Sequence, residues 1–379
     1  RLRRFFITAI LLLLIAGCGS VDGQPESVVP ESPPPQAAPV IQPAENEPEN
    51  QPPEDGEPEE EPYPEYIWQY APREYYDDID SEALGRFFDE LGGVNIHGCI
   101  ILQDGLIIDE YYNYTGGYHE DHLFRIRSST KSIISILIGI AAEQGYISGV
   151  DAPVADFFPE PPPGWDDITI AHLLGNISGI YWREWNGGTM LRQMSTSENW
   201  VEFLLDLPVE HTPGTIFNYN TGGFHLLTAI IQEATGETAH SFAERNLFRP
   251  LGISNMEWRL DPQGISNGNG ISLTVRDLAK LGQLYLDGGR LDDMQIVPEH
   301  WVEESTSRQS PGMPGTGTYG YGWWLRELSG HDVYYAMGAR GQYIFVVPKL
   351  RLVTVMTSDL QDTYIPQRIF RDYLLPVFG

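Results

Sequence analysis

The amino-acid sequence predicts an α+β fold: one antiparallel sheet flanked by helices, formed from both ends of a globular domain and interrupted by an all-helical insertion. Strand-like runs lie near both ends of the globular part, at residues 95–114 and 320–360. The stretch between them, from about 146 to 270, holds mainly helical patterns. Hydrophobic residues make up 41% of the 379 residues, which is enough for a sizeable core.

The domain, which we expect to span residues 66–379, begins with a helix and a hairpin. Residues 81–92 place apolar side chains on one helical face and end in a glycine pair, a typical helix stop. Residues 95–114 form two strand-like runs joined at Asp104-Gly105, and Asp-Gly is a strong signal for a tight hairpin turn. We therefore expect a helix packed against an antiparallel hairpin.

A buried helix is predicted next, over residues 131–145. Apolar residues occupy nearly every face of this run, and Gly145 ends it, so the helix should lie in the centre of the protein. The run is too short for a membrane span. Further helical patterns, separated by Pro- and Gly-rich loops, lie at 169–177, 197–207, 222–236 and 239–252.

The C-terminal part of the chain returns to the sheet. A helix is expected over residues 275–289, and a last helix near 367–375. Between them, strand-like runs lie at 320–328, 333–348 and 351–360.

The first 65 residues differ in composition from the domain. Three arginines precede an apolar run from Phe5 to Ala16, as in a secretory signal peptide. The run ends in "IAGC", which is similar to a bacterial lipobox, so we expect a signal peptide over residues 1–17 and lipid attachment at Cys18. Residues 18–65 are acidic, rich in Pro and Glu, and lack an apolar period, which predicts a disordered tether.

The formal charge of −30 excludes one class of partner. So acidic a chain repels nucleic acid, and we expect none as a partner. The N-terminal lipid would instead hold the protein to a membrane, as an extracytoplasmic lipoprotein of a bacterium. Only two cysteines occur, so lipidation of Cys18 leaves Cys99 without a disulfide partner, and we expect a small buried apolar side chain there.

A polar run at the start of the buried helix carries the first candidate chemistry. In "RSSTKS", Ser128 and Lys131 lie three residues apart, on one helical face. Burial lowers a lysine pKa, from about 10.4 toward about 7–8, which would let Lys131 take the serine proton. Backbone N–H groups at the helix N-terminus could stabilise an oxyanion. The alternative is a helix cap, because serine and threonine are common there.

A second candidate lies in "TPGTIFNYNTGGFHLL". A Pro-Gly turn is followed by Tyr219, Asn220 and Thr221, and then by a glycine pair that opens a helix. Tyr219 could share a proton with Lys131 and Ser128, and Thr221 could donate to the lysine or to a substrate. A tyrosine of the core or of a turn is the alternative.

Several blocks of the chain, taken in order, resemble one family. The blocks are S-x-x-K before an apolar helix, "ITIAHLLGNISGI", "PGTIFNYNTGG", "LFRPLGI" and "GISLTVRDLAKLGQLYLDGG". They resemble the serine beta-lactamase-related and penicillin-binding-protein-like hydrolases, above all class C-type esterases and 6-aminohexanoate-dimer hydrolase-like amidases. The likeness covers roughly residues 85–375. It implies a beta-lactamase/transpeptidase-like fold.

The resemblance also implies a mechanism through an acyl-enzyme, without metal or organic cofactor. Ser128 would be the nucleophile, Lys131 its activating partner, and Tyr219 a general base and then a general acid. Thr221 stands where many relatives have Asn or Ser, so its polar contact is kept while its partner is open.

The strand that would border the site departs from the family pattern. Relatives with lactamase or peptidase activity have Lys/His-Thr/Ser-Gly there, and the best match in this chain is Ala336-Met337-Gly338. Gly338 retains the glycine that allows the strand to approach the site closely. The Ala339 N–H would be an oxyanion donor beside the N–H of Ser128. A substrate carboxylate thereby loses its cationic anchor; Arg340 could substitute for it, but the sequence alone does not place that side chain.

We therefore expect a hydrolase that cleaves an ester or amide of a small molecule. A beta-lactamase or D-alanyl peptidase is one alternative, and a ligand or cell-wall sensor that is acylated without turnover is another. Rival signals are weak: G-x-S-x-G does not occur, and "HEDH" lacks the zinc-binding H-E-x-x-H spacing. The tryptophans at 182, 185, 323 and 324 could belong to the core or could line an apolar pocket.

Overall fold

The structure is a computed structural model that describes residues 66–184 and 188–379. The predicted signal peptide, the lipid attachment at Cys18 and the tether lie outside the described residues, as does Trp185. In the described part, no helix combines the length and apolar character that crossing a membrane requires.

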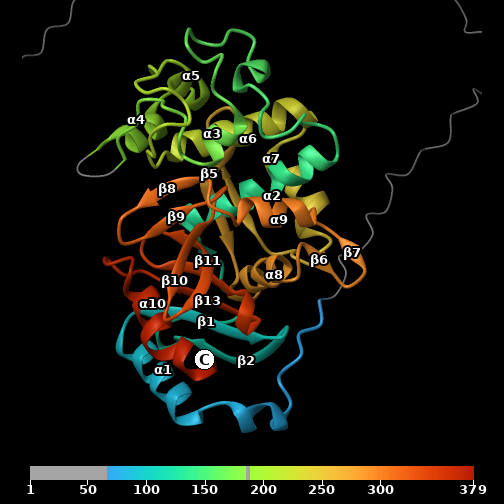
Figure 1. The fold of residues 1–379 in the computed structure, drawn as a ribbon, viewed down its shortest axis with the longest axis vertical. Helices are drawn as coiled ribbons and strands as arrows, with labels where there is room; N and C mark the ends of the chain where they lie inside the picture. The colour runs from blue at the N-terminus through green and yellow to red at the C-terminus, as the bar shows by residue number, and fades with distance from the viewer. Residues whose placement is uncertain (1–65, 185–187) are drawn as a thin grey trace, which may run out of the picture. The chain divides into compact units, whose positions relative to one another are not determined.

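An eight-stranded antiparallel sheet forms the centre of the domain, with the strand order β2-β1-β13-β12-β11-β10-β9-β8 (Figure 1). Its strands are β1 (Ile96–Gln103), β2 (Leu106–Tyr112), β8 (Ser310–Met313), β9 (Gly317–Tyr319), β10 (Trp324–Leu328), β11 (His331–Gly338), β12 (Gln342–Val347) and β13 (Leu352–Ser358). β1 pairs along its length with β13, so strands from both ends of the domain lie side by side, as predicted.

The β1–β2 hairpin turns at the predicted Asp-Gly pair. Asp104 has φ 51° and Gly105 has φ 79°, so both central residues are left-handed. Two left-handed residues define the tight turn whose twist matches that of the flanking strands. The register of β1 against β2 therefore follows from the local sequence.

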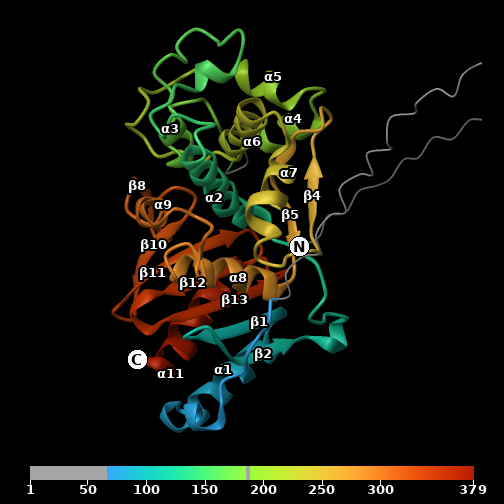
Figure 2. The same ribbon diagram turned by 90° about the vertical axis from the view of Figure 1, so that its right-hand side faces the viewer.

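Helices cover both faces of the sheet (Figure 2). One face carries α1 (Ser81–Gly93) and the C-terminal helices α10 (Ile365–Ile369) and α11 (Leu375–Phe378), which a π-helical turn at 370–374 joins. The other face carries α8 (Val275–Leu286), which packs against β1, β12 and β13. The helices predicted at 81–92, 275–289 and near 367–375 are confirmed.

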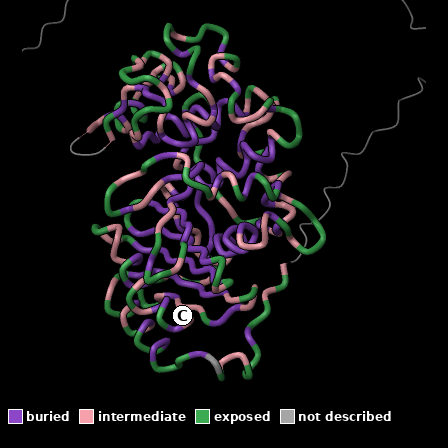
Figure 3. Tube along the Cα trace, in the orientation of Figure 1, coloured by how far each residue is buried: buried purple, intermediate pink, exposed green. Residues whose placement is uncertain are grey.

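The two covered faces create two hydrophobic cores. In β1, Cys99 and Ile101 belong to the core beneath α1, whereas Ile100 and Leu102 belong to the core on the α8 side. Successive side chains of a strand point to opposite faces, so a sheet covered on both sides needs apolar residues at nearly every position. Figure 3 shows buried residues along these strands, and Cys99 is buried as predicted.

Helix α2 (Thr130–Glu143) lies between the sheet and the helical region (Figure 1). Every residue from Thr130 to Ala141 is buried, and Gly145 follows the helix with φ 78°. The prediction of a central helix is confirmed. On its far side lie five short or medium helices: α3 (Ile170–Leu174), α4 (Met190–Thr196), α5 (Trp200–Leu205), α6 (Thr221–Thr235) and α7 (Ala239–Ala243).

The expectation that residues 146–270 are all helical is wrong at the end of that range. β4 (Glu257–Leu260) pairs there with β5 (Ser266–Leu273), and β5 also pairs with β3 (Phe124–Arg125). The "NGNG" of β5 resembles a loop in sequence. Its glycines have no side chain, however, and this lets the strand lie close against α6. A Cβ on Gly268 would come within 2.6 Å of the His225 backbone nitrogen.

The remaining elements connect α8 to the sheet. They are the small hairpin β6 (Arg290–Leu291) and β7 (Met294–Gln295), and helix α9 (Glu299–Ser305), which packs on α2.

Two helical glycines differ in their surroundings, and we expect opposite effects from the same substitution. A Cβ on Gly139 in α2 would come within 2.4 Å of the buried Trp301 ring, whereas nothing lies within 4 Å of a Cβ on Gly85 in α1. Gly139→Ala should lower the free energy of unfolding by about 1–3 kcal/mol through overpacking. Gly85→Ala should raise it by about 0.5–1 kcal/mol through helix propensity. Urea unfolding measures both, and equal effects would contradict the packing of α9 on α2.

Candidate active site

The run "RSSTKS" begins α2, and its hydroxyl groups have different partners. Ser129 donates to a backbone carbonyl of β12 (3.4 Å), Ser132 donates to the Gly322 carbonyl (2.7 Å), and Thr130 accepts from a backbone N–H of β5 (3.3 Å). These three bonds fasten the start of the helix to its surroundings. Ser128 is half-buried, and its hydroxyl lies instead within reach of Lys131.

Lys131 is 1% exposed, and its amine lies between two hydroxyl groups. The Nζ atom is 3.2 Å from Ser128 Oγ and 2.9 Å from Thr221 Oγ1, and an ammonium at this position donates to both. Burial lowers the pKa of Lys131 from 10.5 to about 8, while the charge of Glu184 acts in the opposite direction. The structure thus places the hydroxyl groups of Ser128 and Thr221 beside the Lys131 amine, which loses its proton more easily than a free lysine does.

Tyr219 closes the other side of this cluster. Its ring centroid lies 4.8 Å from Lys131 Nζ, and the ring stacks on Trp324 at 6.0 Å. Burial raises the pKa of Tyr219 well above its usual value, and the nearby Tyr319 and Glu184 add to the rise. A hydrogen bond with Ser128 acts in the opposite direction. The phenol therefore contacts the predicted nucleophile and remains protonated across neutral pH.

Asn176, in the "GNISGI" block, fixes the loop that carries Tyr219. Its side-chain carbonyl accepts from the Asn220 N–H (2.9 Å), and its backbone carbonyl accepts from the Asn218 N–H (2.8 Å). Asn176 has φ 56°, a left-handed conformation that a short amide side chain tolerates. The two bonds hold the residues before and after Tyr219 and thereby set the direction of its side chain.

Glu184 is a site residue that the sequence did not reveal. Its Oε1 accepts from the Thr221 hydroxyl (2.7 Å), and its Oε2 accepts from the Thr221 N–H (3.0 Å) and from Trp182 Nε1 (2.9 Å). Thr221 is the first residue of α6, so the carboxylate also lies at the positive end of that helix. A useful signal would have been an acidic residue within the tryptophan-containing run "YWREW".

The sequence leaves open whether four tryptophans lie in the core or line a pocket. The three that the structure describes belong to the core. Trp182, Trp323 and Trp324 are each at most 1% exposed. Trp182 packs close to the start of α6, where a Cβ on Gly222 would come within 2.9 Å of its ring. Its role at the site is the indole N–H that it donates to Glu184.

Gly338 brings the end of β11 to the turn that holds Ser128. A Cβ there would lie 2.2 Å from the Ile126 carbonyl oxygen, so no other residue fits without movement of the backbone. The β11–β12 ladder ends at the Gly338–Gln342 pair, and Ala339 is the first residue beyond it. Ala339 and Ser128 thus lie on adjoining segments, and their joint role as oxyanion donors stays a prediction.

The position that carries a cation in some relatives is apolar here. Ala336 is fully buried within β11. Arg340 lies in the exposed turn beyond Gly338, where its guanidinium pairs with Asp359 at 3.2 Å. Asp359 also pairs with Arg127, at 3.9 Å. Arg340 therefore shares one exposed carboxylate with Arg127.

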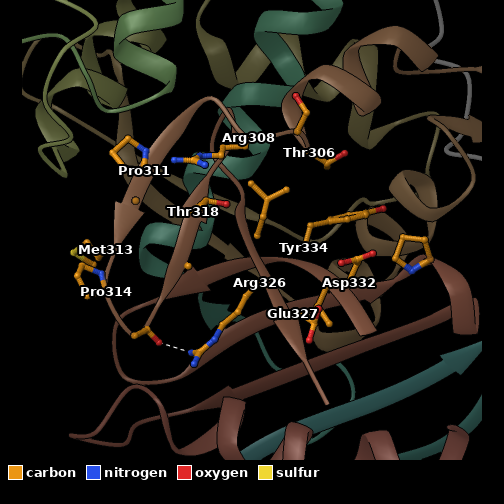
Figure 4. A pocket seen from close by; sticks show the side chains of 17 residues that line it. Thr306, Arg308, Pro311, Met313, Pro314, Thr318, Arg326, Glu327, Asp332 and Tyr334 are labelled. Atoms are coloured by element: carbon orange, nitrogen blue, oxygen red, sulfur yellow. Dashed lines mark hydrogen bonds between the residues drawn. The ribbon is translucent and has the colours of Figure 1, made fainter. Parts of the chain in front are cut away.

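A separate groove lies on the sheet, away from these residues (Figure 4). It has a volume of about 950 Å³ and is lined by the β8–β9 hairpin, parts of β10 and β11, and the segment after α9. Arg326 crosses it to bond the Gly315 carbonyl. Ser128, Lys131 and Tyr219 do not line it, so the groove is distinct from the candidate chemistry. Across residues 66–184 and 188–379, no group of three His, Cys, Asp or Glu side chains is placed to hold a metal ion.

Comparison with known proteins agrees with the fold. Residues 99–368 match the family model described as Beta-lactamase. The chain belongs to the beta-lactamase family. The family resemblance and the beta-lactamase/transpeptidase-like fold predicted from the sequence are therefore confirmed, and the family is one of hydrolases.

Individual relatives are distant. The chain is 24% identical over 288 residues to the 6-aminohexanoate-dimer hydrolase of Paenarthrobacter ureafaciens, covering 69% of this chain and 72% of that protein. The D-amino acid amidase of Ochrobactrum anthropi SV3 superposes with a TM-score of 0.63 at 18% identity, covering 78% and 99% of the two chains. An octameric penicillin-binding protein homologue from Pyrococcus abyssi gives 0.63 at 21% identity, covering 78% and 77%.

The burial of Lys131 makes the stability of this beta-lactamase family member depend on pH. Its pKa is about 8 in the folded protein, against 10.5 for a free lysine, so between these values the unfolded chain binds more protons and stability rises with pH. Lys131→Met should remove this rise, which is on the order of 3 kcal/mol, and should stabilise the protein near neutral pH. Urea unfolding between pH 7 and pH 10.5 measures both effects.

Lys280→Met is the matched control. Lys280 is also buried, but it pairs with Asp277 at 2.9 Å. Its loss leaves a buried carboxylate unpaired, which should destabilise the protein. Stabilisation by both substitutions, or by neither, would contradict the difference between the two lysine environments.

Proposed function

We propose that the protein is a serine hydrolase that cleaves an ester or amide bond of a small molecule through an acyl-Ser128 intermediate. The observation that supports this best is the contact between Ser128 Oγ and the amine of the buried Lys131, at 3.2 Å. A lysine with a pKa of about 8 is neutral in roughly one molecule in ten at pH 7, because the pH lies about one unit below the pKa. A neutral amine beside a serine hydroxyl is a competent general base.

Lys131 is better suited than Tyr219 to take the first proton. The pKa of Tyr219 lies well above 10, so its phenolate is scarce at neutral pH, whereas neutral Lys131 is readily populated. The family resemblance alone implied that Tyr219 is the first base. We instead assign Tyr219 the transfer of a proton to the leaving group, for which a protonated phenol is required.

The proposed reaction has two stages. Ser128 Oγ attacks the carbonyl carbon while its proton passes to Lys131 Nζ, and the backbone N–H groups of Ser128 and Ala339 bind the resulting oxyanion. The intermediate collapses to the acyl-serine as Tyr219 donates a proton to the departing alcohol or amine. Water then attacks the acyl group while its proton passes to the Tyr219 phenolate, and Ser128 Oγ departs with the proton that Lys131 took in the first stage.

The surroundings of β11 favour substrates that carry no carboxylate beside this strand. Ala336 provides no cation, and Arg340 lies off the strand, in an exposed turn where it shares Asp359 with Arg127. Esters and linear amides are therefore favoured over penicillins and acyl-D-alanine peptides, whose carboxylate would lack a partner at this position. The Paenarthrobacter ureafaciens relative is named a 6-aminohexanoate-dimer hydrolase, which supports a linear amide as one candidate substrate.

We also propose that the protein acts outside the cytoplasm, held to a membrane by lipid on Cys18. This proposal rests on the basic and apolar residues before Cys18 and on the "IAGC" run, all of which lie outside the described residues. The acidic composition supports the absence of nucleic-acid partners.

Replacing the proposed nucleophile should abolish turnover. We expect Ser128→Ala to lower kcat by about 10³-fold or more on whichever of p-nitrophenyl esters, 6-aminohexanoate dimer or a chromogenic cephalosporin is cleaved. Ser129→Ala is the control, because that hydroxyl bonds a backbone carbonyl and should affect stability more than rate. Mass spectrometry should detect an acyl adduct on the wild type alone. Activity that survives in Ser128→Ala would exclude the assignment, and a stable adduct without turnover would identify a sensor.

The pH dependence of kcat/KM should identify the base. With Lys131 as the base, kcat/KM should rise with pH through an apparent pKa near 8, because the neutral amine is the active form. Tyr219→Phe should lower kcat by about 10²–10⁴-fold and leave this rise where it is. Disappearance or a large displacement of the rise in Tyr219→Phe would show that the tyrosine, not the lysine, takes the serine proton.

A further inference from the structure

We propose that Glu184 is a positioning residue: it fixes the direction of the hydrogen bond between Thr221 and Lys131, so that the lone pair of the neutral amine stays available for the Ser128 proton. The inference rests on the proposed function, because it takes Lys131 as the base.

The direction of the Thr221–Lys131 hydrogen bond follows from counting the protons available in a chain of four hydrogen-bonded groups. Ser128 Oγ, Lys131 Nζ, Thr221 Oγ1 and Glu184 Oε1 lie at successive distances of 3.2, 2.9 and 2.7 Å. A carboxylate has no proton to donate, and a hydroxyl has only one. Thr221 must therefore donate to Glu184 and can only accept from Lys131.

This direction decides what the amine can do once it is neutral. A neutral amine has two protons and one lone pair, and the bond to Thr221 uses one of the protons. The lone pair can then point to Ser128 and receive its proton during attack. If the Thr221 proton were free to turn, it could donate to Lys131 and occupy that lone pair. Glu184 prevents this by holding the Thr221 proton.

Glu184 is itself held in a fixed orientation. Its Oε2 accepts two N–H groups, from Trp182 Nε1 at 2.9 Å and from the backbone of Thr221 at 3.0 Å. Oε1 is thereby left for the Thr221 hydroxyl. The indole is fully buried, so the carboxylate is presented by a rigid side chain. The carboxylate acts one hydroxyl away from the amine, and its charge opposes the effect of burial on the pKa of Lys131.

Substitution by glutamine tests the role, because it keeps the size of the side chain while removing the charge. The amide can present an N–H to Thr221, which frees the hydroxyl proton to turn toward Lys131. We expect Glu184→Gln to lower kcat about 10- to 100-fold through misplaced hydrogen bonds. The rise of kcat/KM with pH should also move to lower pH, because an ammonium without a nearby anion loses its proton more easily.

Glu210→Gln is the matched control. Glu210 pairs with Arg183, the residue next to Glu184, at 3.1 Å on the surface. This substitution removes the same charge from the same part of the molecule and touches no member of the chain. It should leave both kcat and the pH profile unchanged. A loss of activity in Glu184→Gln with an unmoved pH profile would reduce Glu184 to a structural role and overturn the proposal.

A double-mutant cycle tests the path through the hydroxyl. In Thr221→Val the chain is already broken, so adding Glu184→Gln should lower kcat no further. If the double variant instead lost the product of the two single fold-decreases in kcat, Glu184 would act by a route other than Thr221, which would contradict the proposal.

A titration separates this inference from the proposed function. The pKa of Lys131 can be followed by NMR of ¹³C-labelled lysine in the full protein, with Lys131→Met assigning the signal. Glu184→Gln should lower that pKa, and Glu210→Gln should not, whether or not any substrate is turned over. An unchanged pKa in Glu184→Gln would overturn the role of Glu184 even if Ser128 proves to be the nucleophile.

Discussion

The burial of one amine, that of Lys131, is the constraint on which the arrangement of the site depends. A carboxylate in direct contact would restore the ammonium and raise its pKa, and no such contact exists among the described residues. Glu184, the anion whose charge raises the pKa of Lys131, lies beyond the Thr221 hydroxyl and does not pair with the amine directly. Burial lowers the pKa of Lys131 and the charge of Glu184 opposes that effect, so the two together set the share of neutral lysine.

The same constraint explains why rigid groups surround the cluster. A buried amine with few partners keeps its position only if each partner is fixed by the scaffold. Trp182 holds Glu184, Asn176 holds the loop of Tyr219, and Gly338 lets β11 lie against the turn before Ser128. These residues take no part in bond-making, yet they determine where the reactive atoms lie.

Sequence reasoning succeeded where the signal is local and failed where it is not. Ser128 and Lys131 are three residues apart, and the Asp104-Gly105 turn has two left-handed residues, so both patterns can be read directly. Glu184 meets Thr221 across 37 residues, and the acidic residue in "YWREW" does not by itself indicate which residue it contacts. β5 was missed because its glycines, which look like a loop, serve to bring the strand onto α6.

The pairing of β1 with β13 has a consequence for how the protein folds. Thr357 donates to the Gly98 carbonyl across 259 residues, so the second neighbour of β1 is synthesised long after β1 itself. Until then a strand that is apolar on both faces has one open edge, and closing so long a loop is entropically slow. During synthesis the chain therefore carries an unpaired, aggregation-prone edge until β13 emerges to cover it. The central sheet is therefore complete only when two segments far apart in the sequence have met.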